Sequence, residues 1–427
     1  MVIIKRKLFN PIKDHLQDKE ITLITGPRQA GKTTLMKQLE GDLRAKGEKT
    51  LFLDLDIDRD RPFFASQDSL IQRIQYEIGK EKGYVFIDEI QRKENAGLFL
   101  KGIYDMQLPY KFIVSGSGSL ELKEKIHESL AGRKRVFELP TLSFEELVAF
   151  KTDYNYTNPD GTLKEPATFF AIYGKKALFY LEEYLNFGGY PRVVLETEIS
   201  KKQVAIDEIY RSYLEKDISV LLNIRKTESL TQLVRILAFQ AGNLINISEL
   251  SNTLGLAMQT VKNYLWYLEK TFIVERISPY FKNIRKEITK SQTYYFVDLG
   301  FKNYAANQFG NALGATVGFL FENFVYGVLK EGIYLSPTTI HFWRSKDKAE
   351  VDFVIDAVSE IIPVEVKYTN LKKPEMSRSF KSFLTKYKPK RAYVVHLGER
   401  FEEEFNNTKI SFLPYYEIGK ITKDLQH

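Results

Sequence analysis

A glycine-rich loop near the start of the chain combines the side-chain types that bind nucleotide phosphates. The apolar run 21–25 is followed by Gly26, four further residues and then Gly31, Lys32 and Thr33, where a helical pattern begins. Glycines allow backbone N–H groups to approach phosphate oxygens closely, and the start of the helix adds partial positive charge. We expect Lys32 to neutralise the β and γ phosphates of ATP and the Thr33 hydroxyl to bind Mg²⁺. The residues expected to contact the nucleotide are Gly26, Pro27, Arg28, Gln29, Ala30, Gly31, Lys32, Thr33 and Thr34.

Two acidic residues at the end of a second apolar run argue against a chance glycine–lysine loop. The run 84–87 leads into Asp88 and Glu89, and doubly wound sheets present catalytic groups where their strands end. We expect Asp88 to hold Mg²⁺ through water and Glu89 to orient and polarise the attacking water. These assignments predict an ATP hydrolase rather than a protein that only binds nucleotide.

Hydroxyl and arginine side chains complete the predicted catalytic set. A third strand pattern, 111–119, ends in Ser115 and Ser117, and either serine is a candidate to sense the γ-phosphate. Arg133 and Arg135 follow. An arginine here either completes the site of a neighbouring subunit as a finger on the γ-phosphate or pairs with surface acids; we favour the finger and assign it to Arg133.

A second group of acids lies near the C-terminal end. Residues two apart on a strand share a face, so Glu365 and Lys367 point the same way, and Asp352 begins the neighbouring strand. Upstream, Glu322 interrupts the apolar run of an amphipathic helix. Carboxylates bind Mg²⁺ through hard oxygen ligands, the metal lowers the pKa of bound water, and a lysine steadies the resulting hydroxide. Glu350 shares a strand face with Asp352 and is an alternative ligand.

This C-terminal set resembles the signature of PD-(D/E)XK nucleases. The resemblance implies a nuclease-like α/β domain with a second metal site at Glu322, Asp352 and Glu365, assisted by Lys367. A surface ion pair is the plainer explanation of an acid–x–lysine strand end. A nuclease-like fold does not by itself imply DNA cleavage, so the sequence leaves nuclease activity open.

The elements around these residues predict an α/β protein. Strand patterns alternate with helical ones from 21 to 139, which implies a parallel sheet with helices on both faces. The segment 151–168 is rich in turn residues, and the helical stretch 204–222 follows as a candidate lid or plain spacer.

Residues 247–283 have the pattern of a winged helix-turn-helix. A short helix, a turn at Gly255 and a second helix precede a strand and a turn. The second helix of such a motif commonly enters a DNA groove, although the motif also serves in protein contacts. The basic segment 282–290 adds charge for a phosphate backbone, with Lys282, Arg285, Lys286 and Lys290 against Glu287. The helix residues expected to face outward are Gln259, Thr260, Lys262 and Asn263.

The motif order resembles a family of bacterial and archaeal ATPases. "ITGPRQAGKTTL", "YVFIDEIQ", "FIVSGSGS" and "LAGR" are similar to AAA domain 14, a P-loop AAA+ core. Later stretches resemble the domain of unknown function 4143 that accompanies it, namely "FGGYPRVV", "YLEKDI", "YYFVDLGF", "LFENFV" and "EVDFVI…IPVEVK". The resemblance implies an AAA+ ATPase with ATP and Mg²⁺ as cofactors.

Length and composition set the outer limits. At 427 residues the chain is long enough for several domains. We expect an ATPase core at 1–150, a linker and helical lid-like region at 151–228, a winged helix at 229–290 and a nuclease-like domain at 291–427. The absence of cysteine and of a secretion signal leads us to expect a cytoplasmic protein without a membrane span. The net charge of +7 is mild and permits nucleic-acid contact.

Three functional hypotheses follow. The first is an oligomeric ATPase that couples hydrolysis to binding, moving or remodelling duplex or branched DNA. The second is an ATP-regulated, metal-dependent DNA nuclease. The third is a nucleotide switch that recruits a protein partner and contacts no nucleic acid.

Overall fold

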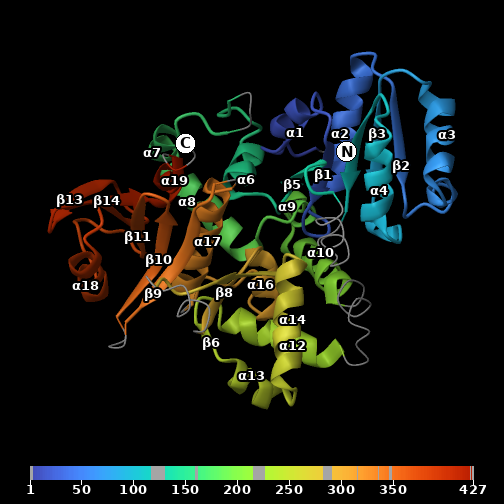
Figure 1. Ribbon diagram of the computed structural model, residues 1–427. Helices are drawn as coiled ribbons and strands as arrows, with labels where there is room; N and C mark the ends of the chain where they lie inside the picture. Colours follow the sequence, from blue (N-terminus) through green and yellow to red (C-terminus); the bar gives the residue numbers. More distant parts are fainter. Residues whose placement is uncertain are drawn as a thin grey trace. The chain divides into compact units, whose positions relative to one another are not determined.

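The computed structural model describes residues 3–116, 130–158, 162–214, 227–281, 291–314, 316–334, 336–345, 349–423 and 425 (Figure 1). Two compact units share the chain. The first comprises 1–163, 189–227 and 264–273, and the second comprises the remaining stretches of the chain. These units interleave along the sequence, whereas the four expected domains are consecutive, and their boundaries stay a prediction. Within the described residues, no helix is both long and apolar enough to span a membrane.

A five-stranded parallel sheet organises the first unit. Its strands stand in the order β2-β3-β4-β1-β5 (Figure 1). The strands are β1 (Ile21–Thr25), β2 (Thr50–Asp54), β3 (Gly83–Asp88), β4 (Tyr110–Ser115) and β5 (Lys134–Glu138). Because β4 lies between β1 and β3, the carboxyl ends of these three strands meet at one edge of the sheet.

Helices cover both faces of this sheet, as the alternation of strand and helix predicts. Successive strand residues point to opposite faces, so Leu23 and Val85 join one core while Ile24 and Phe86 join the other. The helices α3 and α4 contribute to the first core, and α1 and α2 contribute to the second. The helices of the unit are α1 (Phe9–His15), α2 (Lys32–Ala45), η1 (Arg61–Phe64), α3 (Gln67–Ile78), η2 (Ile90–Arg92), α4 (Ala96–Asp105), α6 (Phe144–Lys151), α9 (Pro191–Leu195) and α10 (Ile199–Arg211).

A six-stranded mixed sheet forms the C-terminal part of the second unit. Its order is β13-β14-β12-β11-β10-β9. The first three strands along the chain are antiparallel, and α18 (Arg378–Tyr387) then crosses over so that β12 runs parallel to β11. The strands are β9 (Thr339–Arg344), β10 (Glu350–Ala357), β11 (Glu360–Val366), β12 (Arg391–His396), β13 (Phe401–Phe405) and β14 (Thr408–Pro414). Phe380 and Phe383 of α18 pack with Trp343 in the core of this sheet.

A small antiparallel sheet, β6-β8-β7, completes the second unit. Its strands are β6 (Leu244–Ile245), β7 (Val274–Ile277) and β8 (Gln292–Phe296). Helix α13 (Ile247–Leu254) ends at Gly255 in a left-handed conformation, and α14 (Met258–Lys270) follows, with its residues from Tyr264 onward assigned to the first unit. The other helices are α7 (Pro166–Ile172), α8 (Gly174–Phe187), α12 (Thr227–Phe239), α16 (Leu299–Ala305), α17 (Val317–Gly332), η4 (Tyr415–Glu417) and α19 (Gly419–Lys423).

Candidate functional site

The loop between β1 and α2 has the backbone that a phosphate cradle requires. Gly26 has a φ of 145° and Gly31 a φ of 97°, a region that side-chain-bearing residues rarely adopt. A Cβ atom on Gly26 would lie 2.1 Å from the carbonyl oxygen of Leu139, so no larger residue fits there. The sequence therefore places glycine where the loop turns and where it passes close to a neighbouring backbone.

Lys32 is buried at the point where this loop becomes α2. Its ammonium donates to the carbonyl oxygens of Gly26, at 3.1 Å, and Pro27, at 2.7 Å. The backbone N–H of Arg28 donates to the Tyr213 hydroxyl at 2.6 Å. The predicted nucleotide-binding residues 26–34 thus form one continuous loop and the first turn of a helix.

Asp88 and Ser115 meet at the carboxyl ends of β3 and β4. The Ser115 hydroxyl and the Glu89 N–H both donate to Asp88 Oδ1, the latter at 3.1 Å. Asp88 is 1% exposed, and its Oδ2 has no hydrogen-bond partner among the described residues. A buried carboxylate oxygen without a partner is costly unless a ligand completes it. The donor set therefore fits Mg²⁺, held by Asp88 directly or through water together with the Thr33 hydroxyl.

Glu89 is held beside Asp88 in a strained backbone conformation. Its φ is 55°, unusual for a residue with a side chain. The Gln91 amide donates to its carboxylate. Burial raises the pKa of Glu89, while the positive charge of Lys32 and the Gln91 hydrogen bond act in the opposite direction. Sequence reasoning did not identify Gln91, although it stands two residues after the predicted catalytic acid.

A cavity of about 120 Å³ adjoins the P-loop. Ala30 and Gly31 contribute loop atoms, and Thr34 and Gln38 contribute polar groups from α2. The remaining lining residues are Ile4, Arg6, Leu35, Pro191 and Leu195. The sequence offered one signal for this wall, the "GYPR" stretch that contains Pro191.

Arg133 lies at the other end of the sheet from the P-loop of its own chain. Its carbonyl oxygen accepts from the N–H of Ile21, the first residue of β1, whereas the P-loop follows the last residue of that strand. The guanidinium pairs with Asp105 at 2.8 Å in a partly exposed position. Arg135 lies over the Phe137 ring, 5.3 Å from its centroid. A finger role for Arg133 is therefore open only toward another subunit.

The C-terminal acids come from three neighbouring elements of the second unit. Glu322 projects from α17, Asp352 from β10 and Glu365 from β11, and Lys367 follows β11 directly. Burial raises the pKa of Asp352 to about 7, with contributions from Glu365 and Glu350. Burial, followed by the charge of Asp352, also raises the pKa of Glu322 well above its ordinary value. The structure therefore brings the predicted acids into electrostatic contact.

Protein groups already engage most of these side chains. Asp352 Oδ2 accepts from the Val366 N–H at 2.7 Å, and both Glu365 oxygens accept from the N–H of Ser377, which caps α18. The Tyr295 hydroxyl donates to Glu322, a contact that no sequence signal indicated. The Lys367 ammonium donates to the Glu375 carbonyl at 2.9 Å. Glu350 lies 3.8 Å from Arg344.

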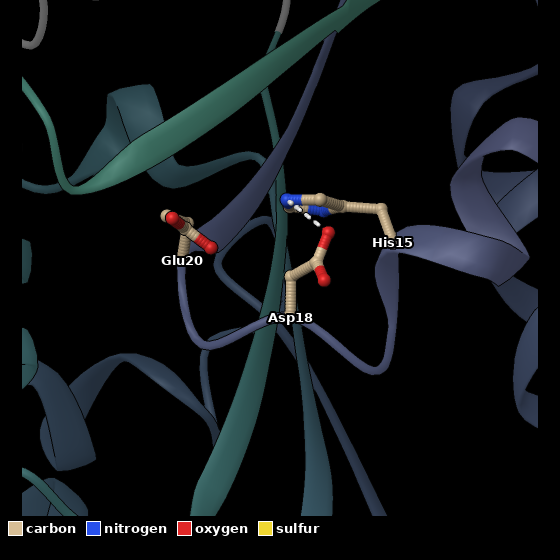
Figure 2. Close-up of side chains that lie close together, drawn as sticks. All are labelled: His15, Asp18 and Glu20. Carbon is tan, nitrogen blue, oxygen red and sulfur yellow. Dashed lines mark ion pairs between the residues drawn. The ribbon is translucent and has the colours of Figure 1, made fainter.

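One cluster of metal-ligand side chains within the described ranges has its ligand atoms within 4.8 Å of one another, namely His15, Asp18 and Glu20 (Figure 2). The C-terminal acids are not gathered so tightly. The ammonium of Lys111 donates to the Asp18 carbonyl at 2.8 Å and lies 3.5 Å from His15 Nδ1. Burial and the charge of Lys111 lower the pKa of His15 to about 4. The ammonium of Lys111 thus already places a positive charge beside these side chains, where a metal ion would otherwise do so. We therefore assign this cluster a structural role.

The predicted outward face of α14 is exposed at Gln259, Lys262 and Asn263, while Thr260 is half-buried. The Gln259 amide donates to the Asn263 carbonyl oxygen at 3.0 Å. The basic segment 282–290 and Ser117 lie outside the described residues.

Three family models match the chain in series. Residues 18–148 match an AAA domain, 178–312 a domain of unknown function (DUF8612) and 317–418 another domain of unknown function (DUF4143). The front of the chain therefore carries an AAA-type P-loop domain. The stretches 187–194 and 294–301, which resembled DUF4143 in sequence, fall within the match to DUF8612 instead.

Two uncharacterised relatives align with most of the chain. The chain is similar to an uncharacterised protein of Mycobacterium tuberculosis, 27% identical over 410 residues, covering 93% of this chain and 81% of the relative. An uncharacterised protein of Methanocaldococcus jannaschii is 25% identical over 358 residues, covering 82% and 76%. The Aeropyrum pernix ORC1 protein, solved in complex with DNA, aligns with 73% of this chain and 95% of its own at 14% identity and a TM-score of 0.31. A TM-score this low carries no argument, and the fold assignment rests on the family match and the geometry.

Proposed function

We propose that this protein is a Mg²⁺-dependent ATPase that couples hydrolysis to DNA. One observation carries the ATPase part: Asp88 keeps a buried, unpartnered carboxylate oxygen at the strand edge that bears the P-loop. Phosphates would lie against the backbone N–H groups of 26–34, with Lys32 beside their β and γ oxygens. Bound Mg²⁺ would neutralise charge on these oxygens.

Glu89 would act on the attacking water. Its raised pKa makes it a better proton acceptor than an ordinary carboxylate, provided that it is ionised at the working pH. Gln91 fixes the orientation of this carboxylate. The Ser115 hydroxyl donates to Asp88. From this position at the end of β4 it would also sense the γ-phosphate. The cavity beside Thr34 and Gln38, which adjoins the loop and the first turns of α2, would receive the nucleobase.

DNA contact is supported by the topology around α13 and α14. The order α12, β6, α13, α14, β7, β8, with the sheet order β6-β8-β7, supports the winged helix-turn-helix that we propose here. The basic segment 282–290 follows β7, where a wing would extend. A protein-binding role for this module remains the alternative, in which the chain is a nucleotide switch.

The test of coupling is ATP turnover with and without duplex, single-stranded and branched DNA, in Mg²⁺ at modest salt. We expect one DNA form to stimulate turnover, with binding that weakens as salt rises. Turnover indifferent to every DNA would reject coupling and favour the protein switch.

The proposal includes an oligomer in the cytoplasm, in which Arg133, which lies away from the P-loop of its own chain, would act on the site of a neighbouring subunit. Lys32→Ala subunits lack a working P-loop, and Arg133→Ala subunits lack the finger. We expect each variant to be inactive alone and a mixture to regain turnover, since some interfaces then combine an intact P-loop with an intact finger. A mixture as inactive as its components would contradict action between subunits.

An ATP-regulated nuclease is the second candidate, favoured by the order of elements in the C-terminal sheet. Helix α17, three antiparallel strands, α18 and a parallel strand carry Glu322, Asp352 and Glu365 in the order that the nuclease signature requires. Cleavage in Mg²⁺ that is lost in Asp352→Ala while ATP turnover survives would establish it.

A further inference from the structure

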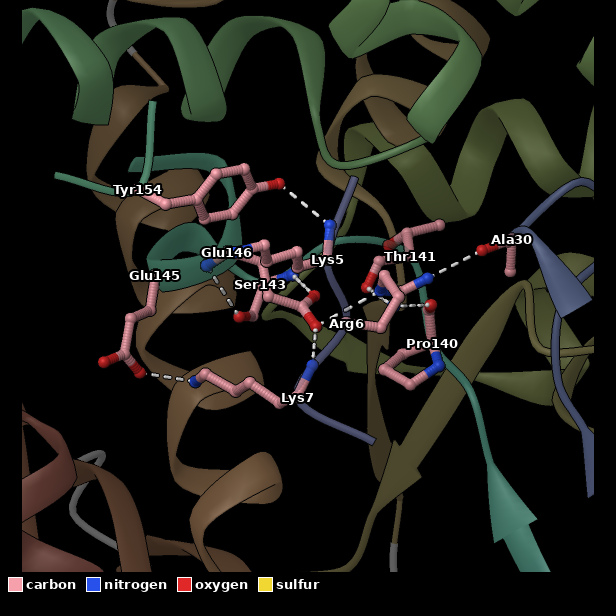
Figure 3. Close-up of polar contacts among 10 residues, drawn as sticks. All are labelled: Lys5, Arg6, Lys7, Ala30, Pro140, Thr141, Ser143, Glu145, Glu146 and Tyr154. Atoms are coloured by element: carbon pink, nitrogen blue, oxygen red, sulfur yellow. Dashed lines mark hydrogen bonds and ion pairs between the residues drawn. The ribbon is translucent and has the colours of Figure 1, made fainter. Parts of the chain in front are cut away.

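The guanidinium of Arg6 is buried against the P-loop. Arg6 is 7% exposed and precedes the first helix of the chain. Its Nη1 donates to the Ala30 carbonyl oxygen at 2.7 Å, and its Nη2 donates to the Pro140 carbonyl oxygen at 2.6 Å (Figure 3). Its Nε donates to Glu146 at 3.1 Å. Every nitrogen of the guanidinium is therefore engaged, and one of them holds the backbone of the nucleotide-binding loop.

Both ends of the P-loop rest on the same short segment, 139–141. At the first end, Gly26 passes so close to the Leu139 carbonyl that a Cβ would collide with it. At the other end, Arg6 links Ala30 to the carbonyl oxygens of Pro140 and Thr141. The segment braces the loop directly at one end and through a side chain at the other.

The bond to Ala30 sets the direction of a backbone donor. A trans peptide is planar, and its C=O and the following N–H point in opposite directions. Because the Ala30 carbonyl points at Arg6, the N–H of Gly31 points away from it. Phosphate binding depends on how such N–H groups are aimed. Gly31 has no side chain to resist rotation of this peptide, so an external constraint is needed.

An acid holds Arg6 in turn. Glu146 accepts from the Lys7 N–H at 2.7 Å and from the Ser143 N–H at 3.0 Å, and Ser143 caps α6 (Figure 3). The rigid fork of a guanidinium can meet these partners together, whereas the ammonium of a lysine is a single point charge on a flexible stem. The geometry therefore requires arginine at this position.

We propose that Arg6 is a positioning residue for nucleotide binding, which fixes the Ala30–Gly31 peptide so that the Gly31 N–H faces the phosphates. This role rests on the proposed ATPase function. The plainer explanation is that Arg6 and Glu146 only fasten the N-terminal segment to α6. The two explanations differ in which variants lose nucleotide affinity.

The test compares three variants of the full-length protein. Arg6→Lys keeps the positive charge but replaces the fork that meets Ala30, Pro140 and Glu146 together with a single ammonium. Glu146→Gln leaves Arg6 itself and its donor to Ala30 unchanged, but it removes the negative charge and one of the two acceptors that meet Arg6, Lys7 and Ser143. Lys7→Ala removes the ion pair between Lys7 and Glu145 in the same segment, at 2.5 Å, without touching the loop. The readouts are the Kd for a fluorescent ATP analogue in Mg²⁺ and the urea midpoint of unfolding.

We expect Arg6→Lys to raise the Kd for the analogue about tenfold or more, as loss of a charge-assisted hydrogen bond predicts. Glu146→Gln and Lys7→Ala should stay within roughly threefold of wild type, even where their urea midpoints fall. Equal losses of affinity in all three variants, or an unchanged Kd in Arg6→Lys, would overturn the proposal. Should Arg6→Lys not fold, Arg6→Gln takes its place, with the same expected loss of affinity and the same contrary outcome.

The wild-type protein and Lys32→Ala separate this proposal from the ATP site itself. If the wild type binds the analogue and Lys32→Ala abolishes this binding, the assignment of the ATP site stands, whatever the Kd of Arg6→Lys. Absence of binding in the wild type would reject the ATP site and the role of Arg6 with it.

Discussion

The two acidic sites of this molecule use the same side-chain types but differ in how much of each group is still available to a ligand. In the first unit, Asp88 keeps one buried carboxylate oxygen without a partner among the described residues. In the second unit, Asp352 accepts from a backbone N–H and Glu365 accepts from the start of a helix. The first site thus keeps a carboxylate oxygen that can accept a ligand, whereas backbone donors engage Asp352 and Glu365 of the second site, although burial and the neighbouring acids still raise the pKa of Asp352.

This difference teaches that a motif identifies donors but not their availability. Asp88 and Asp352 both follow from strand-end patterns that the sequence displays plainly. Only the structure distinguishes a buried carboxylate oxygen that has no partner among the described residues from a carboxylate that a backbone N–H engages. We therefore rank ATP hydrolysis above DNA cleavage. The following changes would break or sharpen this comparison.

Removal of the P-loop lysine should have the largest effect. Lys32→Ala deletes the ammonium that would face the β and γ phosphates, and we expect turnover to fall at least about 100-fold. The measurement is steady-state phosphate release in Mg²⁺. Lys37→Ala, on an exposed position of the same helix, is the matched control and should hydrolyse ATP normally. Equal rates in the two variants would contradict the assignment of the loop.

Glu89→Gln should separate binding from hydrolysis. The amide cannot accept a proton from water, so we expect turnover to fall roughly 100-fold while the Kd for ATP changes little. Glu81→Gln changes an exposed acid of the same unit and serves as the control. Normal turnover in Glu89→Gln would show that another residue orients the water.

The His15 cluster should make the first unit sensitive to acid. The pKa of His15 is about 4 in the folded protein, below the ordinary 6.5. The unfolded state therefore binds more protons between these two pH values. Stability is present above pH 6.5 and is lost as the pH falls toward 4, by about 3 kcal/mol from this group. Urea unfolding from pH 7 to 4.5 measures it, and His15→Asn should flatten the dependence. A strong stabilisation by Zn²⁺ that His15→Asn abolishes would contradict the structural role.

Changes in the C-terminal site should affect ATP turnover least. Asp352→Ala and Lys367→Ala leave the P-loop unit untouched, and we expect ATP hydrolysis within about twofold of wild type. The same preparations, assayed on duplex and branched DNA in Mg²⁺, test cleavage. A large loss of ATP turnover in both variants would show that the two sites are coupled.

The sequence predicted the parts of the fold that have strong local signals. The glycines of the P-loop, the two acids at the end of β3 and the turn at Gly255 all stand where the patterns placed them, because each depends on neighbouring residues. The cap of α13 shows the limit. Asn246 accepts from the N–H groups of Ser248 and Glu249, and the pattern of apolar residues did not indicate this cap.

Contacts between distant stretches could not be predicted from one sequence. Arg6 meets Ala30 and Glu146 across 24 and 140 residues, and Tyr295 meets Glu322 across 27. No periodicity links such positions, because they are set by tertiary packing rather than by local propensity. The order of strands, which places Ser115 between the P-loop and Asp88, is equally a property of the whole sheet.

Steady-state ATP hydrolysis by the wild-type protein and Glu89→Gln, titrated with the DNA form that binds best, tests the central claim most directly. We predict Mg²⁺-dependent turnover in the wild type that rises with DNA, and tight ATP binding with little turnover in Glu89→Gln. Absence of Mg²⁺-dependent hydrolysis by the wild type, with or without DNA, would contradict the account.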